Sequence, residues 1–459
     1  MKNASVFRML CKLVLVLGLV VASVKAQPVT KVVDHGPDGE KLTFVVLGDG
    51  YAAGDQAKYA QDVQRLVVNG VFGHDFYKEN VSAFNVYRVD LVSKDSGVST
   101  LTDSRDTALK VVYSGDWNRC WLEESAETDQ LIIDATGGVK KADFILIVAN
   151  EGGYGGCQRG GRLYITAGDN WDVVAHEYGH GIAGLYDEYT VGGIYTDPPI
   201  NIKNCSTVLD RNGVSWRRLI DAATPLPSDS VASADPNQTV GMFTGCDYAT
   251  KGIYRPVKEC RMKPNTPRFC PVCLGLMKNA VSPYLTAAPA PGRAATESQP
   301  TGSGTTYVNM VMRISKDKPP QILRATQLSG RVISRSNSIP SYLFAFTKKG
   351  RPSYVQYLPD NPFTVRGFID PKHPERGEKL LESETATVIV NVPNTDMSSA
   401  TRDLGLQVFS VSPAGMDAFA RSESIDVDLL LRKLKNNKAI SMKTDFPASE
   451  LGQAVKSIQ

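Results

Sequence analysis

The sequence predicts an α/β (α+β) domain followed by an all-β, sandwich-like C-terminal domain. Three observations predict this fold class: strand and helix patterns that alternate up to residue 285, a segment poor in large apolar residues at 286–306, and short alternating strands after it. The chain has 459 residues, of which 42% are hydrophobic and 22% are charged. Such a chain is too long for one compact core and too apolar to be disordered, so we expect several packed domains.

The first 26 residues predict a secretory signal peptide. Basic residues precede an apolar run from Leu13 to Ala22, and Val24 and Ala26 supply the small residues of a cleavage site. A membrane anchor is the alternative, but the run is shorter than the ~18 to 20 apolar residues of a span. We therefore expect cleavage near Ala26 and a mature chain without a membrane span, secreted or otherwise periplasmic or extracellular.

The charge of the mature chain is expected to be close to neutral. Four of the 51 Lys and Arg residues and none of the 48 Asp and Glu residues lie in residues 1–26. The remainder has a formal charge of −1, which argues against a strongly basic nucleic-acid binder. We expect no nucleic-acid partner.

Elements of the first domain, 27–285, follow from hydrophobic periodicity. Leu42 to Leu47 and Phe84 to Val92 predict strands, Asp55 to Val68 has helical spacing, and the uninterrupted apolar run Phe144 to Ala149 predicts a strand buried on both faces. Buried strands mixed with helices are typical of an α/β layered fold.

The segment 286–306 predicts a linker, because Pro, Gly, Ala, Ser and Thr replace large apolar residues there. In the accessory domain, 307–459, apolar residues alternate after Tyr307, and Ala386 to Val392 and Leu404 to Val411 predict further strands. Ile425 to Leu434 fits a strand or a short helix. We expect the two domains to share few contacts.

Seven cysteines remain after residue 26, and all lie between residues 120 and 273. In an exported chain this clustering predicts disulfides, with at least one thiol left over. We predict that Cys120 pairs with Cys157 and that Cys260 pairs with Cys270 or Cys273. Cys270-x-x-Cys273 also resembles a zinc motif, but no second such pair or nearby His completes a tetrahedral set.

The chemistry is concentrated in residues 168–189, GDNWDVVAHEYGHGIAGLYDEY. Asp169 or Asn170 can cap a helix that Gly184 ends in a left-handed conformation. On this helix His176 and His180 are four residues apart, so both imidazoles project from one face and can bind one ion. Glu177 lies beside the first ligand, where a carboxylate can accept a proton from water without coordinating the metal.

A catalytic zinc takes three protein ligands, so one more is needed. No histidine follows the helix closely, and an oxygen ligand must serve. Asp187, just past the Gly184 turn, is the predicted third ligand, with Glu188 as the alternative. A more remote carboxylate on a later helix is the weaker choice.

The runs HEYGH and LYDEY, with LGDGY at Leu47 to Tyr51, resemble the IgA peptidase family of metallopeptidases, which are metzincin-like zinc endopeptidases. The resemblance covers roughly residues 35–285. It implies a metzincin-like domain in which Met262 lies in a tight turn under the zinc. It also implies a substrate-binding edge strand above the active-site helix, made of Arg162, Leu163, Tyr164, Ile165 and Thr166.

The family pattern is not matched everywhere. Ala183 and Tyr186 stand where metzincins have Gly and the third His, with Gly184 and Asp187 one residue later. The tyrosine that some metzincins use on the oxyanion is also missing two residues after Met262. Tyr189 and Tyr254 are the candidates for that role.

The resulting hypothesis is a secreted zinc endopeptidase that acts on protein or peptide substrates with one catalytic Zn²⁺ and Glu177 as general base. The alternative is an exported binding or adhesion protein with a structural metal site. An intact Glu177 favours the enzyme, since a structural site has no use for a carboxylate that is not a ligand. The sequence does not decide whether calcium is also bound.

Overall fold

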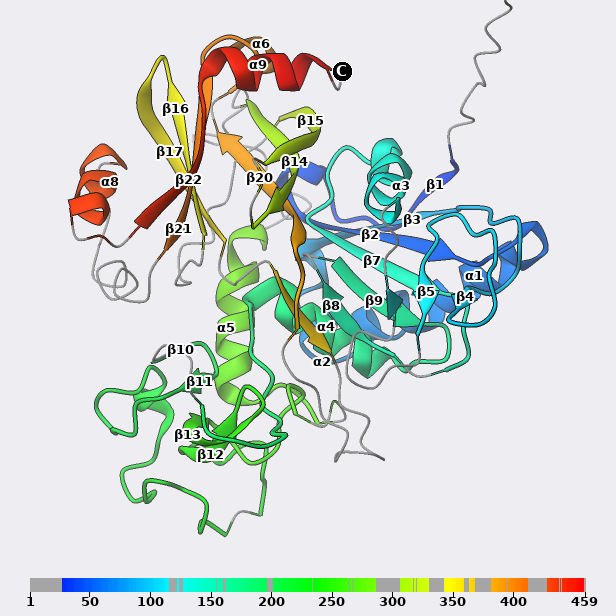
Figure 1. Cartoon of the computed structure of the whole chain (residues 1–459). Helices are drawn as coiled ribbons and strands as arrows, with labels where there is room; N and C mark the ends of the chain where they lie inside the picture. Colours follow the sequence, from blue (N-terminus) through cyan, green and yellow to red (C-terminus); the bar gives the residue numbers. More distant parts are fainter. Residues whose placement is uncertain are drawn as a thin grey trace, which may run out of the picture.

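The computed structural model (Figure 1) describes most of the chain after the predicted signal peptide. The described residues are 27–114, 122–123, 127–153, 155–159, 162–195, 201–232, 234–263, 265, 267–285, 306–316, 318, 320–329, 342–358, 363–367, 381–393, 395–411, 427–436, 438 and 440–457. The predicted signal peptide, Cys120 and all of the predicted linker except Thr306 lie outside these residues, so those predictions stay untested.

An eight-stranded mixed sheet forms the centre of the first domain. β2 is parallel to β3 and β7, and β7 is parallel to β9, whereas β1 and β8 are antiparallel to their neighbours. In spatial order the strands are β1 (Val29–Val33), β3 (Phe84–Val89), β2 (Leu42–Asp49), β7 (Phe144–Ala149), β9 (Arg162–Thr166), β8 (Cys157–Arg159), β18 (Thr364–Gly367) and β19 (Leu381–Glu382).

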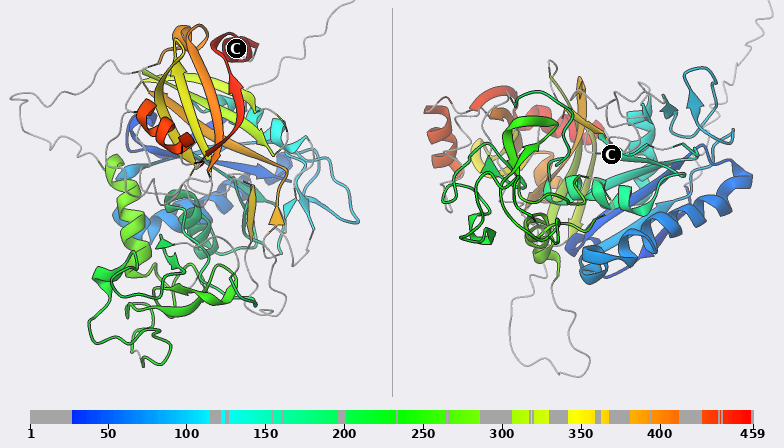
Figure 2. Two further views of the ribbon diagram at one scale, coloured as in Figure 1. Left: turned by 60° about the vertical axis from the view of Figure 1, so that its left-hand side comes forward. Right: turned by 90° about the horizontal axis from the view of Figure 1, so that it is seen from below.

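Helices cover both faces of this sheet (Figures 1 and 2), because β2 and β7 are apolar on both sides. Phe44 and Val46 of β2 belong to a core shared with the helices of one face, while Val45 and Leu47 belong to a second core with α3. The helices of this domain are α1 (Gln56–Val63), α2 (Asp75–Glu79), α3 (Thr128–Ala135), α4 (Trp171–Ala183) and α5 (Pro271–Val281). The predicted helix at 55–68 is therefore α1, continued by a π turn over Gln64–Val68.

The LGDGY motif ends β2 and has a structural role. The buried Asp49 carboxylate accepts hydrogen bonds from the backbone N–H groups of Leu109 and Val111 and from the Thr107 hydroxyl. Gly50 has a φ of 75°, and a Cβ there would lie 2.6 Å from the Gly97 backbone. The motif thus attaches two surface loops to the end of the sheet. Nearby lies a small sheet of β4 (Ser99–Thr100), β5 (Val112–Tyr113) and β6 (Leu122–Glu123).

The segment between α4 and α5 forms a separate four-stranded sheet at the bottom of Figure 1. Its strands, in spatial order, are β10 (Asn201–Ile202), β11 (Cys205–Ser206), β13 (Ala249–Arg255) and β12 (Phe243–Cys246).

The C-terminal part has two antiparallel sheets that share one apolar core. One contains β15 (Gln321–Ser329), β14 (Thr306–Ser315) and β20 (Thr385–Pro393), and the other contains β17 (Arg351–Leu358), β16 (Tyr342–Lys348), β21 (Leu404–Val411) and β22 (Ile440–Phe446). The all-β expectation is wrong, because α6 (Met397–Ala400), α8 (Val427–Asn436) and α9 (Ala448–Ser457) are helical. Leu431 and Leu434 of α8 are buried against β16 and β17, which explains why the ambiguous segment is a helix. The chain as a whole contains both helices and strands, as an α+β fold requires.

The expectation of few contacts between the two parts is also wrong. β18, from the C-terminal part, extends the central sheet by pairing with β8. Asp129 of α3 bonds both Arg162 of β9, at 2.5 Å, and Arg313 of β14, at 2.6 Å. Because Arg162 and Asp129 are largely buried, these ion pairs tie the C-terminal part to the central sheet.

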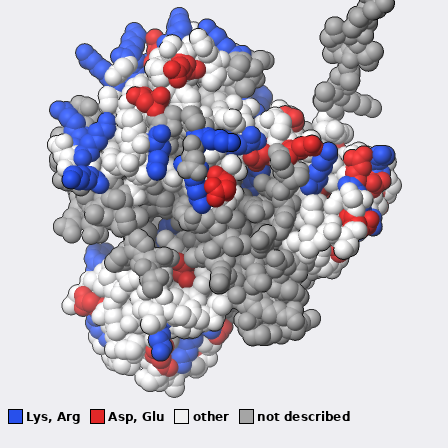
Figure 3. Space-filling model, in the orientation of Figure 1, with Lys and Arg blue, Asp and Glu red and all other residues white. Residues whose placement is uncertain are grey.

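Within the described residues, no helix is long and apolar enough to span a membrane. Figure 3 shows lysines and arginines gathered over the C-terminal sheets, whereas acidic and basic side chains are mixed elsewhere on that face. On this face, positive charge is therefore concentrated over the C-terminal sheets, although the expected charge of the mature chain is near zero.

Candidate metal centre

The helix that presents both histidines begins and ends where its sequence predicts. α4 starts after Asn170, whose backbone is extended, and stops at Gly184, which has φ 59° and ψ 41°. This left-handed conformation suits glycine and lets the chain reverse under the helix. Asp169 does not cap the helix. Its carboxylate instead accepts backbone N–H groups of Gly155 and Thr166, which joins the Gly-rich segment to the end of β9.

His176, His180 and Asp187 converge at one point. The two Nε2 atoms lie 3.1 Å apart, and Asp187 Oδ1 is 3.1 Å from Nε2 of His176 and 3.3 Å from Nε2 of His180. All three side chains are buried. Ligand atoms at ordinary zinc distances in a tetrahedron are separated by about 3.3 Å, so this donor set fits a zinc ion.

Hydrogen bonds fix the orientation of both imidazoles. Nδ1 of His176 is 2.9 Å from the Arg261 carbonyl, and Nδ1 of His180 is 2.6 Å from the Leu185 carbonyl. Because a carbonyl only accepts, each Nδ1 carries a proton, and each Nε2 is the atom that would present a lone pair to a metal at the shared point. Together with Asp187, the histidines have the chemistry and the spacing of a three-ligand metal site.

Glu177 lies on the same helix, is about 1% exposed, and is not one of the three converging residues. The Gly-rich segment before β8 runs close above it: a Cβ on Gly156 would lie 2.4 Å from a Val173 methyl and 3.4 Å from Glu177 Oε1. Only a glycine at this place allows the backbone to approach the carboxylate so closely. Gly156 and its described neighbours therefore form one wall of the site beside Glu177.

Met262 lies under the histidine helix. It is fully buried, and its Sδ is 3.0 Å from the position that a Cβ on Gly179 would occupy. The preceding residue, Arg261, supplies the carbonyl that orients His176. Arg261 is itself held by Asp75, at 2.9 Å, and lies over the Trp171 ring. The residues around Met262 thus form the floor of the site.

The residues predicted as a substrate-binding edge strand, Arg162–Thr166, form an interior strand. β9 pairs with β7 on one side and with β8 on the other, and all five residues are buried. β8 in turn pairs with β18 from the C-terminal part. The edge-strand expectation is therefore wrong for β9, because β7 pairs with one of its edges and β8, which directly precedes it in the chain, pairs with the other.

Tyr248 is a residue of the site that the sequence does not single out. Its hydroxyl donates to Asp187 Oδ2 at 2.8 Å and receives a hydrogen bond from Tyr189 at 3.1 Å. Tyr248 lies in the turn between β12 and β13, where Asp247 and Tyr248 both have positive φ. Of the two tyrosines that the sequence suggested for the oxyanion, Tyr189 bonds the Tyr248 hydroxyl, and Tyr254 lies on β13 as a partly buried residue.

Replacing Tyr248 with phenylalanine should weaken metal binding without abolishing it. The variant loses the hydrogen bond that holds Asp187 Oδ2, and the loss of such an outer bond typically costs about 10- to 100-fold in metal affinity. Competition of the purified variant against a zinc chelator would measure this. Tyr254→Phe is the matched control, and an equal loss of affinity there would contradict the role of Tyr248.

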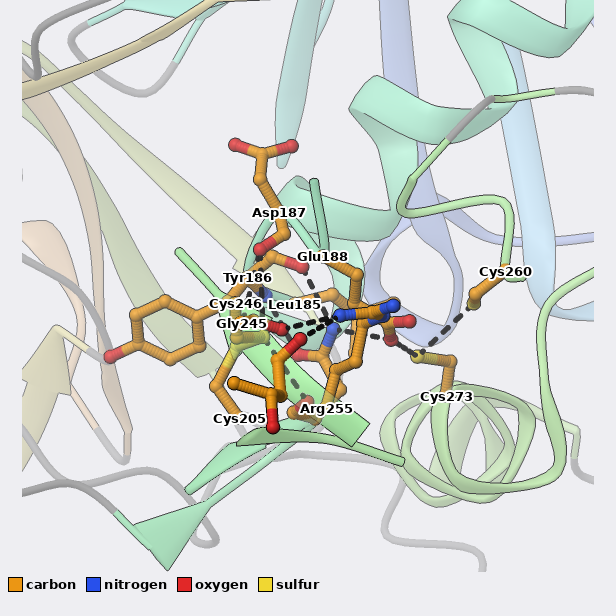
Figure 4. The surroundings of a disulfide bond; sticks show 12 residues. Leu185, Tyr186, Asp187, Glu188, Cys205, Gly245, Cys246, Arg255, Cys260 and Cys273 are labelled. Atoms are coloured by element: carbon orange, nitrogen blue, oxygen red, sulfur yellow. Dashed lines mark hydrogen bonds between the residues drawn. A yellow bond between two sulfur atoms is a disulfide. The ribbon is translucent and has the colours of Figure 1, made fainter. Parts of the chain in front are cut away.

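Asp187 and Glu188 point to different sides (Figure 4). Asp187 faces the histidines, whereas Glu188 extends toward Cys273, whose sulfur is 3.2 Å from Glu188 Oε1. In this arrangement Asp187 is the third ligand candidate, and the alternative, Glu188, belongs to a different cluster. Next to Asp187, a disulfide joins Cys205 of β11 to Cys246 of β12, and Asn204 and Tyr248 lie in the turns beside these two strands.

The predicted pairing of Cys260 with Cys270 or Cys273 is wrong, because all three are free and buried thiols. Cys157 is disulfide-bonded, but Cys120 lies outside the described residues, so the Cys120–Cys157 pair stays a prediction. The Cys205–Cys246 bond was not predicted, because no local spacing indicates it.

Electrostatics in the metal-free site favour a bound proton. Burial alone would lower the pKa of His176, but the hydrogen bond and charge of Asp187 raise it to about 9. Burial alone would raise the pKa of Asp187, yet the two histidines hold it well below its usual range. A protonated His176 therefore neutralises Asp187 when no metal does.

The zinc affinity of this site should rise with pH up to about pH 9. In the folded metal-free protein the pKa of His176 is about 9, above its ordinary value of 6.5. The ion pair between His176 and Asp187 therefore stabilises the metal-free protein fully below pH 6.5. This stabilisation is lost as the pH rises through 9. Zinc must displace the proton, so its affinity should increase about tenfold per pH unit below 9. The zinc concentration for half-maximal reactivation of metal-free protein, measured in metal buffers, tests this. A constant value between pH 7 and 8.5 would contradict it.

One of two comparisons with known proteins found a match. Residues 30–231 match the family model described as IgA Peptidase M64. This range contains β2, α4, His176, Glu177, His180 and Asp187, and it ends before Tyr248 and Met262. A search of curated proteins gave no match.

Proposed function

Because residues 30–231 belong to the IgA peptidase family of metallopeptidases, we propose that the chain is an exported zinc endopeptidase with Glu177 as general base. The observation that carries the proposal is the convergence of His176 Nε2, His180 Nε2 and Asp187 Oδ1 within 3.1–3.3 Å of one another. The family supports peptide hydrolysis, and the signal-like residues 1–26 support export.

The donor set favours zinc over other metals. Two imidazole nitrogens and one carboxylate oxygen in a buried, tetrahedral arrangement are typical of catalytic zinc, with the fourth position left for water or substrate. Zinc bound there would polarise the scissile carbonyl and lower the pKa of a water molecule.

The chain's own residues supply the remaining functions. Glu177 accepts a proton from the attacking water and donates it to the departing amine. Burial of Glu177 beside Gly156 keeps bulk water from competing for that proton. Tyr248 holds Asp187, and the carbonyls of Arg261 and Leu185 hold the histidines, so the ligands are oriented before a metal binds.

A metzincin-like fold for the first domain is supported by Met262 under the helix and by the Gly184 turn that leads to Asp187. A sandwich-like arrangement of the C-terminal part is supported by the common core of its two sheets. We propose that this part stabilises the catalytic domain, since β18 and the Asp129 ion pairs join the two.

Chelation of the full mature chain tests the proposal. Casein hydrolysis should disappear when a chelator removes the metal and should return on addition of stoichiometric zinc. The alternative, a binding protein with a structural metal site, has no such activity. A folded, zinc-loaded protein that cleaves neither casein nor a peptide library would favour that alternative.

A further inference from the structure

A second cluster of potential metal ligands lies behind the histidine site. Glu188 and the thiols of Cys260, Cys270 and Cys273 are all buried, and their ligand atoms lie within 4.8 Å of one another. The residues come from three segments: the chain after α4, the turn before Met262, and the N-terminus of α5. The mechanism proposed above uses none of them.

The distances in this cluster are those of a metal site. Cys260 Sγ and Cys273 Sγ are 3.7 Å apart, whereas a disulfide needs about 2.05 Å. Two thiolates on a tetrahedral zinc, each bound at about 2.3 Å, are about 3.8 Å apart. A thiolate and a carboxylate oxygen on the same ion would be about 3.5 Å apart, and Cys273 Sγ is 3.2 Å from Glu188 Oε1.

The backbone around the cysteines suits thiolates. The N–H of Cys270 points at Cys260 Sγ at 3.3 Å, and the N–H of Cys273 points at Cys270 Sγ at 3.5 Å. Cys270 is the N-cap of α5, and Pro271 follows it in the first turn. Backbone donors and the positive end of a helix both stabilise negative charge on sulfur.

Glu188 completes the set as a fourth ligand. Its Oε1 accepts from Asn204 at 3.0 Å, while its Oε2 is buried and has no hydrogen-bond partner among the described residues. A buried carboxylate oxygen without a donor is costly, and coordination to a cation would satisfy it. The Arg255 guanidinium lies nearby and offsets part of the negative charge.

We propose that Cys260, Cys270, Cys273 and Glu188 bind a structural zinc ion, distinct from the zinc at His176, His180 and Asp187. Four protein ligands leave no open position for water or substrate, which distinguishes a structural zinc site from a catalytic one. Soft thiolate ligands select zinc over calcium or magnesium.

This site supports the floor of the catalytic centre. The N–H of Glu188 donates to the Met262 carbonyl at 2.5 Å, and Cys260 is two residues before Met262. Arg261, which lies between Cys260 and Met262 in the chain, orients His176 through its carbonyl. A zinc ion that joins Glu188 to Cys260 therefore fixes the Met262 turn and the loop after α4 that carries Asp187 in one unit.

Metal content and thiol chemistry of the wild-type mature protein test the proposal without any measurement of activity. We expect two zinc ions per folded chain. After denaturation with a chelator but no reductant, Cys260, Cys270 and Cys273 should all react with iodoacetamide, and Cys205 and Cys246 serve as the unreactive control. One zinc per chain, or a disulfide between any two of the three cysteines, would overturn the proposal.

Variants separate the two sites. His176→Ala with His180→Ala should retain one zinc, and cobalt substituted for that ion should show thiolate-to-metal charge-transfer absorption. Cys273→Ser should lose one zinc and that absorption, and it should melt at a lower temperature. If Cys273→Ser does not fold, the cobalt spectrum of the double histidine variant still decides: a cobalt-loaded protein without thiolate absorption refutes the site. Failure here leaves the peptidase proposal intact, since that depends on the histidine site.

Discussion

Replacing Glu177 with glutamine should lower the rate of peptide hydrolysis by about 100- to 10,000-fold or more while the zinc content stays the same. Glutamine has nearly the same shape as glutamate but cannot accept the proton of the attacking water. Glu177 is not among the three converging ligand residues, so its replacement should not release the metal. Turnover of a short fluorogenic peptide, measured together with zinc per chain, gives both quantities.

The matched control is Glu79→Gln, because Glu79 is an exposed carboxylate at the end of α2. It should hydrolyse the peptide at the wild-type rate. Near-normal turnover by a zinc-loaded Glu177→Gln protein would show that another group removes the proton, and the mechanism would have to be abandoned.

Replacing Asp187 with alanine should empty the histidine site at zinc concentrations that saturate the wild-type protein. Asp187 supplies one of the three ligand atoms. Its loss should therefore lower zinc affinity by more than the loss of the Tyr248 hydrogen bond, for which about 10- to 100-fold is expected. Asp187→Asn keeps the shape and removes the charge, and should lie between the alanine variant and the wild type. The zinc concentration that half-restores peptidase activity to metal-free protein measures the effect.

Glu188→Ala provides the comparison, because Glu188 is the neighbouring carboxylate and faces the cysteines. We expect Asp187→Ala to reduce occupancy of the catalytic site more than Glu188→Ala does. If Asp187→Ala instead keeps wild-type reactivation by zinc while Glu188→Ala loses it, the roles of the two residues must be exchanged.

The helix that carries His176 and His180 could be predicted in detail because its determinants are local. The four-residue spacing of His176 and His180 puts both rings on one face of any helix, and Gly184 can adopt the left-handed conformation that ends it. The apolar runs of β2 and β7 likewise indicate strands buried on both faces. Spacing also placed Asp187 next to the Gly184 turn as a third ligand, although it did not exclude Glu188 from that role.

Errors arose where the prediction depended on which segments meet in space. Arg162–Thr166 has the pattern of a strand, but the pattern does not reveal that β8 and β7 cover both its edges. The described part of the ambiguous segment, from residue 427, is helical because Leu431 and Leu434 pack against β16 and β17. The cysteines 260, 270 and 273 are close enough in sequence to suggest a disulfide, yet Glu188, far away in the chain, lies among them.

By itself, then, the sequence determined the helix that carries His176 and His180, its end at Gly184 and the buried strands of the central sheet. It also pointed to Glu177 as the general base that we propose. Periodicity and backbone preference act within a few residues, and a reader of the sequence has access to both. Only the tertiary structure decided that Asp187, and not Glu188, faces the histidines. It also decided that Tyr248 holds Asp187 and that β18 extends the central sheet. It also decided that Glu188 meets three thiols. Such contacts join segments through packing of the whole fold, and no spacing within one segment specifies them.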